Sequence, residues 1–153
     1  LVKALKRLRN VKLIVKLHPT EDVSTYKILL QELEYDAIIS EDIDLYEILI
    51  CSDLVISIRS TVILEALALK KQVIQLNLVE KHEIFGELAS RCIKMVTSES
   101  ELKSETNNIL YKKPLTEKLI REREKFISEY YYKIDGNSTK RFIGLVEAAL
   151  AKK

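Results

Sequence analysis

The segment Ser52–Leu67, with the sequence SDLVISIRSTVILEAL, carries the clearest structural pattern of the chain. Its apolar run predicts a buried strand at Asp53–Ser57, and the apolar residues that follow predict a buried helix at Thr61–Leu69. Serine and threonine occupy the turn between the two. In an open α/β sheet, ligands bind beyond the carboxyl ends of the strands. A helix that begins there offers unpaired N–H groups and the positive end of its dipole, so we expect a phosphate at this turn.

The same alternation of strand and helix extends through most of the chain. Apolar runs predict further strands at Val11–Leu17, Ala37–Ser40, Gln72–Leu76 and Ile93–Val96. Helical spacing predicts helices at Leu1–Arg9, Val23–Leu33, Ile43–Ile50, Glu83–Ser90, Glu99–Leu110, Leu115–Tyr131 and Thr139–Ala151. The strands are continuous apolar runs, which are typical of a parallel sheet covered by helices on both faces. With right-handed crossovers, this predicts a doubly wound, Rossmann-like α/β fold.

Start signals accompany several of these helices. Glu21 or Asp22 can open the helix that follows the first strand, and Ser98 with Glu101 three residues later fits a capping box. The turn Asp135-Gly136-Asn137 precedes Ser138, which we expect to cap the last helix.

Composition limits the classes of function. The 153 residues are 47% hydrophobic and 31% charged, which is ordinary for a soluble globular domain. The net charge of +2 and the lack of a long basic run give no reason to expect a nucleic acid partner. Cys51 and Cys92 lie in apolar segments, so we expect buried free thiols and a cytoplasmic location. The chain opens at Leu1 within a helix, and we expect residues 1–153 to be a single domain of a longer two-domain protein.

Five residues are candidates for phosphate binding at the carboxyl edge of the predicted sheet. Hydroxyl groups at a helix start are good anion donors, and a histidine at a strand end can hydrogen-bond a phosphate or a base. An arginine in the turn can neutralise a diphosphate. Simple alternatives remain for each: a turn before proline, N-capping, and a solvated charge. The candidates are His18, Ser57, Arg59, Ser60 and Thr61.

Glu65 is the sixth candidate and has a different role. It is the acidic residue of an otherwise apolar helix, and the capping-box position after Ser60 or Thr61 falls on Ile63 or Leu64 instead. A carboxylate buried without a partner costs several kcal/mol. Glu65 is therefore expected to face a cleft, where it can bind hydroxyl groups such as those of a ribose. The alternative is an ion pair with a basic residue such as Arg59.

Other chemistry is not indicated. The chain has no G-x-G-x-x-G, no P-loop and no nucleophile elbow, and its cysteines and histidines lack zinc-ligand spacing. We therefore expect no bound cofactor and no metal, and the residues assign no catalytic base. His82 follows a predicted strand on the same edge and is either a further ligand residue or a loop histidine.

Taken in order, four elements resemble the carboxyl-terminal domain of GT-B glycosyltransferases. They are Lys16-Leu17-His18-Pro19, Ser52–Ser57, Ser60-Thr61 with Glu65-Ala66, and Asp135-Gly136 with Arg141. The chain is most similar to CDP-glycerol glycerophosphotransferases and to bacterial polysialyl- and capsule-polysaccharide transferases. The resemblance implies that His18 contacts the phosphate or nucleotide of the donor, that Ser60 and Thr61 bind phosphate, and that Glu65 binds the ribose.

The resemblance implies a nucleotide-activated sugar or polyol as substrate, of the cytidine type or the uridine type. The parent transferase would act in the synthesis of cell-surface polysaccharide or teichoic-acid-type polymers. Because GT-B catalysis takes place between two domains, the isolated chain would bind a nucleotide without turnover. An amino-terminal domain would supply the acceptor site and any peripheral membrane association. Two alternatives are half of a UDP-N-acetylglucosamine 2-epimerase-like enzyme and a non-catalytic α/β module that binds a nucleotide or a partner.

Overall fold

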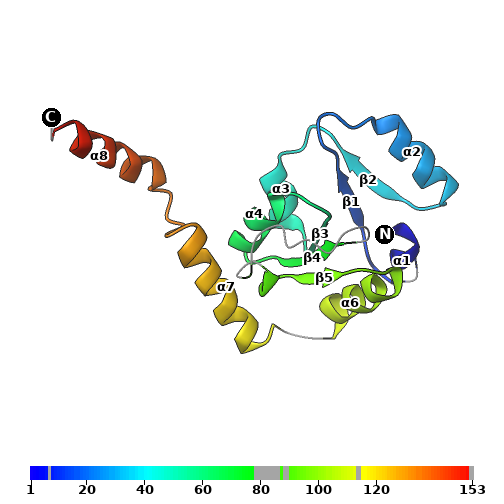
Figure 1. Cartoon of the computed structure of the whole chain (residues 1–153). Coiled ribbons are helices and arrows are strands. Elements are labelled where there is room, and N and C mark those ends of the chain that lie inside the picture. Colours follow the sequence, from blue (N-terminus) through cyan, green and yellow to red (C-terminus); the bar gives the residue numbers. More distant parts are fainter. Residues whose placement is uncertain (7, 78–86, 88–89, 113–114, 152–153) are drawn as a thin grey trace. The chain divides into compact units, whose positions relative to one another are not determined.

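The computed structural model describes residues 1–6, 8–77, 87, 90–112 and 115–151. It is an α/β structure with short parallel strands in two small sheets and helices around them (Figure 1). The chain divides into two compact units, Leu1–Pro114 and Leu115–Lys153. Every strand that the structure describes lies in the first unit.

The first unit alternates helices and strands as the sequence predicts, with shorter strands. Its elements are α1 (Val2–Leu5), β1 (Leu13–Lys16), α2 (Val23–Glu32), β2 (Ala37–Ser40), α3 (Leu45–Cys51), β3 (Leu54–Ser57), α4 (Val62–Ala68), β4 (Gln72–Leu76), β5 (Lys94–Val96) and α6 (Glu99–Tyr111). The helix predicted at Glu83–Ser90 lies almost wholly outside the described residues.

The strands form two parallel sheets. β1 pairs with β2, with Leu13 opposite Ala37, and the other sheet has the order β3-β4-β5. We expected one continuous sheet, but no hydrogen-bonded ladder joins β1 to β3 among the described residues. Two cavities, of about 530 and 290 Å³, are both lined by Ile14 of β1 and by Leu54 and Ile56 of β3. Hollow space therefore occupies the boundary where a ladder would run.

The core of this unit is built around β4. Val73, Ile74 and Leu76 are buried on this strand, where α4 and α6 pack against it. Ile63, Ala66 and Leu67 of α4 are fully buried, together with Leu102 of α6 and Ala4 of α1. The apolar residues of α4 recur three and four positions apart, so one face of the helix covers the sheet.

The helix starts show which of the predicted caps form. Asp22 caps α2 by accepting hydrogen bonds from the N–H groups of Ser24 and Thr25, and Ser98 caps α6 by accepting from the N–H of Glu101. The carboxylate of Glu101 reaches back one residue further than in a capping box, to the N–H of Thr97 at 2.8 Å.

Two other predictions at this level were wrong. Cys51 is exposed, because it is the last residue of α3 and no further helical turn covers it, whereas Cys92 is buried. Asn137, and not Ser138, is the N-cap of the last helix, and it makes no side-chain cap bond. Ser138 is instead the first helical residue, and its hydroxyl lies 3.2 Å from the guanidinium of Arg141.

The second unit contains α7 (Glu117–Tyr130) and α8 (Ser138–Leu150). In α7 the buried ring of Phe126 packs on the ring of Tyr130, with centroids 4.5 Å apart. Between the two helices, Gly136 has a φ of +70°, a left-handed conformation that glycine adopts without steric cost. Across the part of the chain that the structure describes, every helix is too short or too polar to cross a membrane.

Candidate functional site

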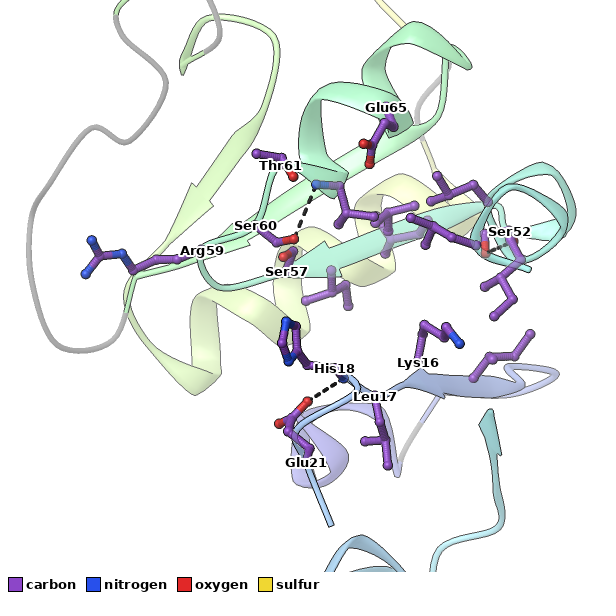
Figure 2. Close-up of a pocket in the computed structure, with 18 of the residues that line it drawn as sticks. Lys16, Leu17, His18, Glu21, Ser52, Ser57, Arg59, Ser60, Thr61 and Glu65 are labelled. Atoms are coloured by element: carbon purple, nitrogen blue, oxygen red, sulfur yellow. Dashed lines mark hydrogen bonds between the residues drawn. The ribbon is translucent and has the colours of Figure 1, made fainter. Parts of the chain in front are cut away.

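The cavity of about 530 Å³ lies at the carboxyl ends of β1 and β3, where the last residues of these strands, Lys16 and Ser57, both line it (Figure 2). Apolar side chains of the strands and of α3 contribute to its wall, and polar side chains gather at the loops that follow the strands. The structure brings all six residues predicted from the sequence to this one cavity: His18, Ser57, Arg59, Ser60, Thr61 and Glu65.

His18 is held by the turn that follows β1. Its backbone N–H donates to the carboxylate of Glu21 at 2.7 Å, and Pro19 prevents the chain from continuing as a central strand. The Nδ1 atom of the ring accepts the backbone N–H of Thr20 at 3.3 Å and lies 2.7 Å from the hydroxyl of Thr20. Figure 2 shows the ring on the side that faces Ser57 and Ser60.

The turn between β3 and α4 presents hydroxyl groups more than free amides. The N–H of Val62 donates to the hydroxyl oxygen of Ser60 at 3.3 Å, and the N–H groups of Ile63 and Leu64 donate to the carbonyls of Ser60 and Thr61. The expectation of unpaired amides in this first turn is therefore wrong, because a tight turn uses them internally. The hydroxyls of Ser57 and Thr61 have no hydrogen-bond partner among the described residues, and the Ser60 O–H can still donate outward.

Glu65 lies on α4 between the cavity and the core. Its neighbours Ile63, Ala66 and Leu67 are fully buried, whereas Glu65 is half-buried and lines the cavity. No hydrogen bond or ion pair reaches its carboxylate from any described residue. The guanidinium group of Arg59 points away from it (Figure 2), so the ion pair considered as an alternative does not form. The carboxylate is thus available to accept hydrogen bonds from a ligand.

Lys16 and Glu21 also line the cavity and were not chosen from the sequence. The side chain of Lys16 donates to the backbone carbonyl of Glu41, and the carboxylate of Glu21 accepts the phenol O–H of Tyr26. The hydrogen bonds from Tyr26 and from the N–H of His18 hold the pKa of Glu21 below its usual range. The sequence could have indicated Lys16 as a site residue, because it ends an apolar strand just before the His-Pro pair.

The motif residues of the last turn belong to the second unit. Arg141 pairs with Asp135 at 2.8 Å within the second unit, and its hydrogen bonds lower the pKa of that carboxyl. His82 lies outside the described residues. In the described part of the chain, no three histidine, cysteine or acidic side chains gather as metal ligands would.

Chemically, the cavity offers donors for an anion and an acceptor for hydroxyl groups. Four hydroxyls, one imidazole and two basic side chains line it, together with the unpartnered carboxylate of Glu65. Hydrogen bonds that involve ionised partners are about twice as strong as neutral ones, so this set is suited to a phosphate that is joined to a polyol. Comparison of the chain with protein-family models, curated proteins and solved structures found no match.

Proposed function

We propose that the chain is the donor-binding domain of a GT-B transferase, and that the cavity at the carboxyl ends of β1 and β3 binds the nucleotide of an activated sugar or polyol. One observation carries the proposal: six residues chosen from the sequence for this chemistry line the same cavity of about 530 Å³. They come from the end of β3, from two loops and from α4. A pocket of 300–1,000 Å³ is the usual size for a small-molecule ligand.

The chemistry of the lining suggests a role for each group. The hydroxyls of Ser57, Ser60 and Thr61 donate to the phosphate oxygens, and Arg59 adds positive charge at the mouth of the cavity. Glu65 accepts the hydroxyl groups of the ribose. In the transferring enzyme, the same donors stabilise the negative charge that develops on the leaving phosphate.

The complete enzyme, in this proposal, has a second domain that carries the acceptor and any contact with a membrane surface. It works in the cytoplasm on polysaccharide or teichoic-acid-type polymers. The nucleotide is of the cytidine or the uridine type and needs no resident cofactor or metal. With nucleotide bound, the edges of β1 and β3 approach, so that the two small sheets form one doubly wound sheet with helices on both faces.

Calorimetric titration of the chain with CMP, CDP, UMP and UDP tests the proposal. We expect at least one of these to bind, and Glu65→Ala to weaken it about tenfold or more, because a charged acceptor of hydrogen bonds is lost. Glu47→Ala is the matched control, since Glu47 is exposed on α3 and does not line the cavity.

Three results would contradict the proposal. Absence of binding to all four nucleotides would favour a non-catalytic module. Equal affinity of the Glu65→Ala and wild-type chains would remove Glu65 from the site. Turnover of an activated donor by this chain alone would show that no second domain is required.

A further inference from the structure

The turn that follows β1 fixes the orientation of the imidazole ring of His18. His18 lies on it, and three hydrogen bonds with Thr20 and Glu21 fix its backbone and one of its ring nitrogens. The carboxylate of Glu21 in turn accepts the O–H of Tyr26 on α2, so the turn is tied to the helix behind it.

The contacts of Nδ1 decide which ring nitrogen carries the hydrogen. A backbone N–H can only donate, so the bond from the N–H of Thr20 at 3.3 Å requires Nδ1 to be an acceptor. The hydroxyl of Thr20, 2.7 Å from the same atom, then acts as a second donor. In neutral imidazole one nitrogen accepts and the other donates, so the hydrogen lies on Nε2. Nε2 has no partner among the described residues, while the ring lines the cavity.

We propose that Thr20 and Glu21 are positioning residues that hold His18 as a hydrogen-bond donor, through Nε2–H, to a phosphate oxygen in the cavity. This inference rests on the proposed nucleotide site. A hydrogen bond from Nε2–H needs no positive charge on the ring. The charge attraction at the site then comes from Lys16 and Arg59, while Glu21 and Glu65 are the acidic groups that face the ring or the cavity.

The first test reads the tautomer directly. Two-dimensional ¹H–¹⁵N NMR of the histidine rings at pH 8, with His18→Asn to assign the signals, should show Nδ1 without hydrogen and Nε2 with hydrogen. The opposite tautomer in the wild-type chain would overturn the inference. This measurement needs no ligand, so its outcome is independent of whether the chain binds nucleotides.

The second test compares two amides as replacements for the ring. The amide nitrogen of glutamine lies near the position of Nε2, and that of asparagine lies near the position of Nδ1. With CDP at pH 8, where the terminal phosphate is fully ionised, we expect His18→Gln to bind about three- to tenfold more tightly than His18→Asn. Equal affinities for the two variants would overturn the inference.

Substitutions of Thr20 and Glu21 test their positioning role separately. Thr20→Val removes the hydroxyl from Nδ1 and should weaken CDP binding about threefold or more, and Thr20→Ser should restore it. Thr25→Val is the matched control, because the hydroxyl of Thr25 bonds to Asp22 and not to His18. Unchanged affinity in Thr20→Val and in Glu21→Ala, with normal binding by the wild-type chain, would remove the positioning role while leaving the proposed function in place.

Discussion

The two small sheets of the first unit are built from similar apolar sequences but are held together differently. In the β3-β4-β5 sheet, β4 is almost wholly buried between helices, with Ile74 0% exposed. In the β1-β2 sheet, Leu13, Ile14 and Val15 are only half-buried, and Ile38 is 42% exposed. An apolar run therefore identifies a strand in both sheets, whereas the neighbours on either side decide how much of the strand is buried.

Local polar contacts support the β1-β2 sheet where apolar burial is small. Lys12 pairs with Asp36 at 3.2 Å across the two strands, and Lys16 donates to the carbonyl of Glu41 beyond the end of β2. Asp22 caps α2, which packs on β2. Such exposed contacts are individually weak, so this side of the cavity is expected to open more easily than the other.

Truncation of one isoleucine in each sheet should give the largest difference. Ile74→Ala removes a fully buried side chain from β4 and should lower the free energy of unfolding by about 2–5 kcal/mol. Ile38→Ala in β2 should lower it by less than about 1 kcal/mol, because much of that side chain already contacts water. Urea unfolding of both variants measures the two values, and equal losses would contradict the difference between the sheets.

Each sheet also contains a buried polar side chain with an unpartnered atom. Gln75 on β4 and Ser40 on β2 are almost fully buried, and in the described part of the chain neither Nε2 of Gln75 nor Oγ of Ser40 has a hydrogen-bond partner. Gln75→Met keeps the volume and removes the unsatisfied amide, so it should stabilise the chain by about 1–2 kcal/mol. Ser40→Ala removes a smaller group and should change stability by no more than about 1 kcal/mol.

Thermal unfolding of Gln75→Met and Ser40→Ala measures both effects. Destabilisation by Gln75→Met would show that the amide has a function in the native sheet. In that case, the buried amide of Gln75 would stabilise its sheet, whereas the buried hydroxyl of Ser40 would not.

The strands, their order along the chain and most helices could be predicted from the sequence, because apolar periodicity and capping residues are local properties. The prediction failed where the outcome depended on contacts distant in the sequence. The break between β1 and β3 is one case, since both are continuous apolar runs of the kind that pair in a parallel sheet. Cys51 is another, since its apolar neighbours predicted a buried thiol, whereas the residue ends α3 with its side chain exposed.

The candidate site shows the same division. The rule that ligands bind at the carboxyl ends of parallel strands selected His18 and Ser57, and the cost of burying an unpartnered carboxylate selected Glu65. The structure brings all three to one cavity. The first-turn N–H groups of α4 donate to oxygen atoms of Ser60 and Thr61 because the turn is tight. The residue types alone do not predict so tight a turn. The hydrogen bonds of Thr20 and Glu21 with His18 depend on the path of the chain after Pro19, and no sequence motif predicts them.

The smallest effect should appear in acid, on the β1-β2 side. Hydrogen bonds from the side chains of Ser24 and Thr25 lower the pKa of Asp22 from 3.8 to about 2. A carboxyl whose pKa is lowered in the folded chain stabilises it above pH 3.8, and this contribution is lost as the pH falls toward 2. Amide exchange at the start of α2 should therefore accelerate between pH 4 and 2, beyond the intrinsic change, before exchange in β4 does.

Asp22→Asn separates the charge from the cap in this experiment. Asparagine is also a good N-cap, so the helix should still form, but the additional acid dependence at Ser24 and Thr25 should disappear. The amides of Val73 and Ile74 serve as internal controls in the buried strand. Loss of protection in both sheets at the same pH would mean that the first unit unfolds as a single cooperative body, and that the exposed contacts of the β1-β2 sheet do not make it the weaker wall of the cavity.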